Sequence, residues 1–183
     1  PILPSDVLDQ PAIRQAGRDA LSLALIDARN HTLHLLAGHE RAAAAPGAGI
    51  GPEVHPSPAL WLAGRAGWFA EQWIGRNTLR ALGSACPPQP PRLASIEPHA
   101  DDWWSGDGAP APARGVSAPP GFDGTRVWLL ETLETTLDLL AGTPEHDDAL
   151  YFYRLALCHE DLLGERLVVL AQTLGLPLGL PEP

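Results

Sequence analysis

The chain has 183 residues, of which 45% are hydrophobic and 19% charged, values typical of one globular domain spanning residues 1–183. Twelve basic and 22 acidic residues give a formal charge of −10, which opposes the phosphate contacts that nucleic-acid binding needs. Two cysteines are too few for a disulfide framework, and the sequence shows neither a secretory signal nor a run of about 18 apolar residues, so we expect a cytoplasmic protein without a membrane anchor.

The first two predicted helices lie in the N-terminal half of the chain. One covers about residues 13–39, and its expected core stripe holds Ala16, Leu21, Ala24, Leu25, Ala28, Thr32, Leu35 and Leu36. The next begins at Ser57-Pro58, a capping residue followed by proline, and runs to a glycine stop at Gly83. Small residues within it, Ala63, Gly64 and Gly67, are expected to allow close helix contact.

Two further helices are predicted in the C-terminal half. The third covers about residues 125–141, with Asp123 as its cap and Gly142 as its end. Its expected core face holds Val127, Leu130, Leu133, Leu137 and Leu140. The fourth starts at Thr143-Pro144 and continues to Leu174. Its expected core stripe is Tyr151, Leu155, His159, Leu162, Arg166, Val169 and Thr173, with Phe152, Ala156, Leu163 and Leu170 alongside.

These patterns predict an all-α fold, because no apolar alternation with a period of two is long enough for a strand. Four helices favour an antiparallel four-helix bundle, with loops over about residues 41–57 and 83–124. The second loop, between helices two and three, is long and rich in proline and glycine, and it contains Trp103-Trp104. If that pair is exposed, it indicates an interface; a loop folded back onto its own bundle is the alternative.

Histidines are the first candidates for metal ligands. His31 and His34 share a helical face, but no carboxylate is arranged with them, so we interpret them as partly exposed residues. His55, His99 and His146 lie in loops or at a helix start and are interpreted as solvated.

His159 is the exception, because it lies on the expected core stripe of the fourth helix. A hydrogen-bonded core histidine and a metal ligand or acid–base group are both open interpretations. The position one turn further on, where a second ligand could share a metal, is Leu163. Cys158 is interpreted as a small core residue, since adjacent helical residues point about 100° apart and cannot form a nucleophile–base pair.

Arg65 is the second candidate, since a guanidinium flanked by glycines and tryptophans in mid-helix needs a counter-charge or a route to solvent. The candidate counter-charges are Glu160, Asp161, Glu71 or a bound anion. The nearby aromatic residues, Trp68, Phe69 and Trp73, are interpreted as packing residues in preference to an aromatic cage.

Several sequence blocks together resemble a known family. They are DAL (19–21), DARNHTL (27–33), PALW (58–61), WFAEQWIGRN (68–77), ALYFYRLALCHED (149–161) and AQTLG (171–175). This pattern is similar to the N-terminal domain of ergothioneine-type sulfoxide synthases, most of all to the selenoneine synthase branch. The resemblance covers nearly the whole chain, and the block around His159 is its most specific part.

The resemblance implies a DinB-like four-helix bundle. In that family the bundle supplies three histidines to a non-haem iron(II), one from the second helix and two from a His-x-x-x-His on the fourth. A C-terminal domain like the formylglycine-generating enzyme completes the active site, where oxygen-dependent C–S or C–Se bonds form. By this resemblance His159 matches the first histidine of the pair, Leu163 occupies the place of the second, and Arg65 stands where the second-helix ligand is expected.

We therefore expect a DinB-like module without an intact iron site and without a cofactor of its own, because leucine cannot ligate and arginine stays protonated. The chain ends at Pro183, before any C-terminal catalytic domain, so that partner is expected in cis or in trans and no catalytic residue is assigned.

Two alternatives remain. In the first, a binding or scaffold bundle uses Arg65, together with Trp68 and Glu160, to hold a small anionic ligand near His159. In the second, a metalloenzyme with rearranged ligands recruits His31, His34 or His99.

Overall fold

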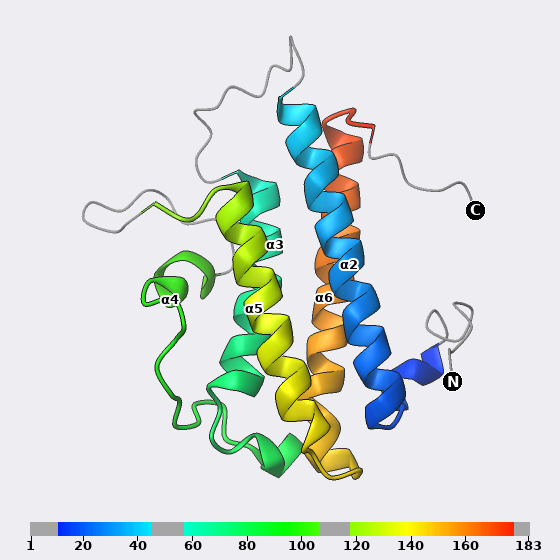
Figure 1. Ribbon diagram of the computed structural model, residues 1–183, viewed down its shortest axis with the longest axis vertical. Coiled ribbons are helices and arrows are strands. Elements are labelled where there is room, and N and C mark those ends of the chain that lie inside the picture. Colours follow the sequence, from blue (N-terminus) through cyan, green and yellow to red (C-terminus); the bar gives the residue numbers. More distant parts are fainter. Residues whose placement is uncertain (1–10, 45–56, 107–117, 178–183) are drawn as a thin grey trace.

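The computed structural model describes residues 11–44, 57–106 and 118–177, and Figure 1 labels its helices. The N-terminal half contains the 3-10 helix η1 (Pro11–Gln15), α2 (Arg18–Ala43), α3 (Pro58–Ala70) and a π-helical turn, η2 (Glu71–Gly75). The 3-10 helix η3 (Arg80–Ala85), the short α4 (Ala100–Trp104), α5 (Phe122–Ala141) and α6 (Asp147–Thr173) follow. Extended pairing within these residues is limited to one isolated bridge, Asn77 with Arg92, so the all-α prediction is confirmed for the part described.

The four longest helices pack side by side, with α2 next to α6, α6 next to α3, α3 next to α5, and α5 next to α2 (Figure 1). Neighbours do not all run antiparallel as expected. In α2 and α6 the contacts advance together, from Arg29 with Glu160 to His39 with Leu167, so these two helices are parallel. The same holds for α3 and α5. Long connections before α3 and α5 permit this arrangement, which a chain of short turns does not.

Helix ends follow local chemistry that the sequence shows only in part. Gly142 caps the end of α5 as predicted, but the N-cap of that helix is Gly121, with Asp123 in the first turn. The fourth long helix begins after His146, whose side chain accepts a hydrogen bond from the Ala149 amide at 3.3 Å, and not at Thr143. Gly83 lies beyond the end of α3, in η3, with a φ of 54°, and an added Cβ there would come within 2.6 Å of the Asp148 backbone.

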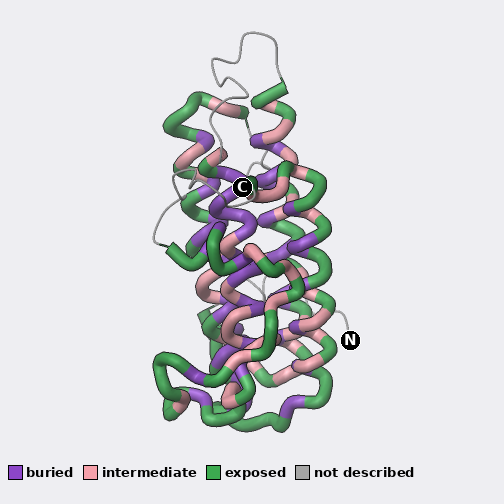
Figure 2. The backbone as a smooth tube through the Cα atoms, turned by 90° about the vertical axis from the view of Figure 1, so that its left-hand side faces the viewer, coloured by how far each residue is buried: buried purple, intermediate pink, exposed green. Residues whose placement is uncertain are grey.

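The buried faces of α2 and α6 differ in how closely they match the sequence pattern. The stripe expected in α2 holds for Leu21, Ala24, Leu25, Thr32, Leu35 and Leu36, and the structure adds Arg29 and His39 to it. In α6 the expected stripe is about one residue off. Tyr151, Leu155, Leu162 and Val169 are exposed, whereas Leu150, Tyr153, Leu157, Glu160 and Leu167 are buried. Of the residues expected alongside the stripe, Phe152, Ala156 and Leu163 are buried as predicted. Figure 2 shows the buried positions gathered where the long helices face one another.

The face predicted for α5 is wrong in a similar way. Val127 and Leu130 are each 53% exposed and Leu133 and Leu137 are half-buried, so of the predicted face only Leu140 is buried. The other buried positions are Thr125, Trp128, Leu129, Thr132 and Thr136. A preference for aliphatic residues misses this face because threonine satisfies its own hydroxyl along the helix. Thr132 and Thr136 each donate to the carbonyl four residues earlier, at 2.9 and 2.7 Å.

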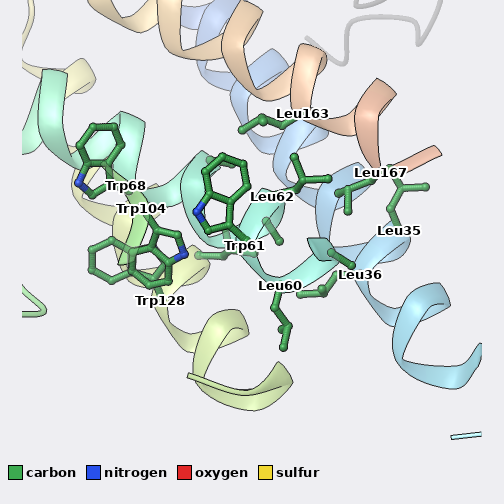
Figure 3. Close-up of a cluster of buried hydrophobic side chains, with 14 of the residues drawn as sticks. Leu35, Leu36, Leu60, Trp61, Leu62, Trp68, Trp104, Trp128, Leu163 and Leu167 are labelled. Atoms are coloured by element: carbon green, nitrogen blue, oxygen red, sulfur yellow. The ribbon is translucent and has the colours of Figure 1, made fainter. Parts of the chain in front are cut away.

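The segment that carries α4, described up to residue 106, folds back onto the bundle and buries the Trp103-Trp104 pair, as the second of the two interpretations expected. Trp104 lies directly against Gly64, where an added Cβ would come within 2.3 Å of the indole, and it stacks on Trp128 at 5.1 Å (Figure 3). The Trp61 indole donates to the Trp103 carbonyl at 3.1 Å. A Cβ added at Gly67 would come within 2.5 Å of the Trp128 indole. The small residues of α3 therefore permit close packing, as predicted.

Among the described residues, none of the helices combines the length and the apolar character needed to cross a membrane.

Candidate functional site

The candidate site lies where α3 and α6 face each other, around His159. The imidazole of His159 stacks on the ring of Phe69, with 3.9 Å between centroids and 22° between planes. Its Nε2 atom is buried and has no hydrogen-bond partner within the described structure. A polar nitrogen left in this state is costly for the fold, and such groups are uncommon.

Burial and charge both keep this imidazole neutral. Desolvation is the largest cause of a lowered pKa, and the positive charges of Arg65 and Arg166 lower it further, to about 4. The nearby Glu160 carboxylate acts in the opposite direction but does not offset them. A neutral imidazole at pH 7 presents one donor and one acceptor nitrogen.

Leu163, one turn beyond His159, is fully buried in an apolar cluster with Leu35, Leu62 and Leu167 (Figure 3). Its side chain therefore fills interior space with carbon only. No ligand atom is available at this position to accompany His159.

Arg65 is half-buried on α3, one turn before Phe69. Its guanidinium carbon lies 5.3 Å from the ring centres of both Trp61 and Trp68, and its Nη1 donates to the backbone carbonyls of Trp104 and Gly106. These contacts direct the guanidinium toward the segment that carries α4. Its charge still reaches His159, but the carboxylates expected to neutralise it have other partners.

Glu160 is the first of those carboxylates, and it forms a buried ion pair with Arg29 of α2. Arg29 Nε and Nη2 donate to the two carboxylate oxygens at 2.6 and 2.9 Å, and Thr32 Oγ1 donates to one of them at 3.1 Å. Arg29 Nη1 also contacts the Leu129 carbonyl and donates to Thr132 Oγ1 at 3.1 Å. Both charged side chains are at least 96% buried, so Glu160 faces α2 and α5 and does not face Arg65.

Glu71 and Asp161 are the other two carboxylates that were expected to neutralise Arg65. Glu71 accepts from Ser95 Oγ at 2.8 Å and from the Ile96 amide at 2.7 Å, and its burial raises its pKa. Asp161 lies 3.9 Å from Arg14, and burial raises its pKa as well.

Trp68, proposed from sequence as part of an anion site, instead anchors the α4 segment. Its indole donates to Asp101 Oδ1 at 2.8 Å, and Arg76 holds both oxygens of the same carboxylate at 2.8 and 2.9 Å. The hydrogen bonds from Arg76 are the main cause of the lowered pKa of Asp101. Trp68 therefore packs and positions, as the packing interpretation of the aromatic residues expected.

The remaining histidines lie apart from this site. His31 and His34 are exposed on α2, His146 caps α6, and His99 is 3.4 Å from Asp102 at the start of α4. His55 falls outside the described residues. His39, not singled out from sequence, is buried and bonded to the Leu167 carbonyl at 3.0 Å. In the described part of the chain, no three His, Cys, Asp or Glu side chains are grouped closely enough to hold a metal ion.

Sequence reasoning missed Arg29, although a signal for it was present. Arg29 is four residues after Leu25 and seven before Leu36, which places it in phase with the apolar stripe of α2. A charged residue in that phase indicates a buried partner on a facing helix.

When the sequence was compared with protein-family models and with curated proteins, neither comparison found a match.

Proposed function

We propose that this chain is a DinB-like four-helix module of the kind found in ergothioneine and selenoneine synthases, with a metal site that has lost its ligands. On this proposal it is a cytoplasmic module that catalyses nothing alone and works beside a catalytic domain like the formylglycine-generating enzyme. The observation that carries the proposal is His159, an imidazole between α3 and α6 whose Nε2 has no partner among the described residues.

The neighbours of His159 do not fit the iron(II) that the resemblance implies. Leu163 offers carbon where a second histidine is expected, and Arg65 brings a fixed positive charge close enough to lower the pKa of His159. A cation loses affinity beside such a charge, and one neutral imidazole is too few donors for a transition metal in a protein.

The two alternatives have less support. Holding an anion requires a guanidinium free to reach it, whereas Arg65 Nη1 contacts two backbone carbonyls and the guanidinium lies against Trp61 and Trp68. A rearranged metal centre requires further ligands near His159, and His31, His34 and His99 lie elsewhere.

Restoring the missing ligands tests the proposal. The double variant Arg65→His with Leu163→His places imidazoles at both positions, and Arg65→Gln with Leu163→Asn is the matched control, similar in size and polarity but a poor ligand set. We expect the histidine variant to bind one Zn(II) or Fe(II) per chain at least tenfold more tightly than the control, by anaerobic calorimetry. Circular dichroism checks that both variants are folded. Equal metal affinity in the two folded variants would mean that the three positions do not converge, and the proposed relationship would fail.

A further inference from the structure

The long helix α6 is apolar on two nearly opposite faces, so apolar area alone does not decide which face is buried. The inner face packs into the core through residues that include Leu150, Leu157 and Leu167. The outer face carries the exposed residues Tyr151, Leu155, Leu162 and Val169. Turning α6 by about half a turn around its own axis would bury one apolar row in place of the other. Another feature of the helix therefore has to fix its orientation.

The buried faces of α2 and α6 each carry one charged residue that could do so. Of the described positions, Arg29 is the only buried residue of α2 with a permanent charge, and Glu160 is the only buried acidic or basic residue of α6. Arg29 Nε and Nη2 lie 2.6 and 2.9 Å from the two carboxylate oxygens of Glu160. Thr32 of α2 donates to this carboxylate, and Arg29 donates to Thr132 of α5. Because each buried face offers one charge, the two can pair in one arrangement of the helices.

A turned or shifted α6 breaks this pairing. After half a turn, Glu160 points to solvent, and the guanidinium of Arg29 stays in the interior without a carboxylate. After a slide by one helical turn, Arg29 faces Ala156 or Gly164, neither of which bears a charge. Both alternatives leave a buried cation without its counter-charge, which is strongly unfavourable.

A second polar contact between α2 and α6 does not discriminate in this way. His39 Nε2 lies 3.0 Å from the Leu167 carbonyl oxygen. Every residue of a helix carries a carbonyl, so a turned or shifted α6 can offer another one to the imidazole. A buried carboxylate, in contrast, occurs at a single described position of α6. The ion pair, and not the histidine contact, therefore distinguishes one arrangement from another.

From these observations we propose that the Arg29–Glu160 pair is the device that selects one orientation and one register of α6 against α2. A single buried polar residue plays the same part in a coiled coil, where it fixes how the helices align. Without the pair the bundle still forms, but α6 lies in more than one orientation. This device does not depend on whether the His159 site has lost a metal, so it stands or falls separately from the proposed function.

Removing both charges while keeping apolar side chains in their place tests this role. The charge-free variant is Arg29→Met with Glu160→Leu. The matched control is Leu35→Met with Leu163→Met, which changes two buried residues of the same two helices, conserves their volume and keeps the ion pair.

Maleimide labelling of introduced cysteines reports the orientation of α6 in the full chain. Leu155→Cys probes the outer face, where the native residue is 37% exposed, and Ala156→Cys probes the inner face, where it is 4% exposed. Cys86→Ser and Cys158→Ala remove the native thiols from all of these proteins. The ratio of the two labelling rates measures how strictly one face is held outward.

With the ion pair intact, in the native background and in the methionine control, we expect labelling at position 155 to be at least about tenfold faster than at position 156. In the charge-free variant this ratio should fall below about threefold, and the amide NMR signals of α6 should double or broaden. Circular dichroism and urea denaturation should still show a helical chain that unfolds cooperatively.

Three results would overturn the proposal. An unchanged labelling ratio with one sharp set of amide signals in the charge-free variant would show that the shapes of the packed side chains orient α6. Loss of cooperative unfolding in that variant would show that the pair is needed for the bundle to form at all. An equal fall of the ratio in the methionine control would show that any change between α2 and α6 loosens the helix.

Discussion

Two adjacent residues of α6, His159 and Glu160, differ in the hydrogen-bond partners that the two sides of this helix offer them. Glu160 faces α2, where Arg29 and Thr32 satisfy both of its oxygens. His159 faces α3, where it stacks on Phe69, and its buried Nε2 has no partner in the part of the chain that the structure describes. Adjacent residues of a helix point about 100° apart, so Glu160 lies in a fully hydrogen-bonded network while its neighbour His159 does not.

The difference separates a structural polar group from a candidate functional one. A buried charge persists in a fold when its partners come with it, as they do for Glu160. A buried ring nitrogen that has no partner in the described structure, such as His159 Nε2, forms no hydrogen bond and still costs desolvation. The α2 side is thus explained by stability alone, whereas the α3 side needs another explanation, which the proposed loss of a metal site supplies.

The largest expected effect comes from removing one partner of the buried ion pair between Arg29 and Glu160. Glu160→Ala leaves the Arg29 guanidinium buried without a carboxylate, and we expect the free energy of unfolding to fall by about 3–5 kcal/mol. Urea denaturation at pH 7 measures it. The double variant Arg29→Met with Glu160→Leu is the control, and it should recover at least half of the loss, since it leaves no charge buried. A loss under about 1 kcal/mol in the single variant would show that the pair is not the structural element described here.

The second largest effect should be a loss of stability at acid pH caused by His159, on the α3 side of α6. His159 has a pKa of about 4 in the folded chain, against an ordinary value of 6.5, so the unfolded chain binds more protons between these pH values. Stability contributed by the neutral imidazole is complete above pH 6.5 and is lost as the pH falls toward 4. Because the side chain is partly exposed, we expect a loss of about 1–2 kcal/mol.

The measurement for His159 is a comparison with His159→Leu, which removes the titrating group and keeps an apolar side chain. Unfolding free energies at about pH 7.5 and about pH 4.5 should diverge between the two proteins, the native chain losing more. The subtraction cancels the carboxylates that both proteins share. Parallel pH profiles would show that the imidazole is not held neutral by its surroundings.

The smallest effect should come from Glu71, also on the α3 side but with the opposite sign. Burial raises its pKa, so protonation favours the folded state and its contribution to stability grows as the pH falls. Glu71→Gln keeps an oxygen that can accept from Ile96, so we expect a change under about 1 kcal/mol at pH 7, with a flattened acid limb. Thermal unfolding of both proteins across about pH 4.5–7 tests this. A loss above about 2 kcal/mol would show that the carboxylate charge itself secures the segment before α4.

Helices were predictable from sequence because their apolar spacing and their proline and glycine boundaries are local properties. The inward face of α6 was not, since its outward face is equally apolar and periodicity alone cannot choose between two apolar faces. The face of α5 was missed because buried threonines satisfy themselves along the helix. Within the site, His159 and Leu163 could be singled out from their spacing, but the partners of Glu160 and Arg65 depend on how distant segments pack, which one sequence does not show.

Metal binding by the native chain tests the central claim most directly. The account predicts that anaerobic titration with Fe(II) or Zn(II) shows no one-to-one binding tighter than about 10 µM, because His159 stands without further ligands beside a fixed positive charge. Tight one-to-one binding that His159→Ala abolishes would contradict the account and place a working metal centre between α3 and α6.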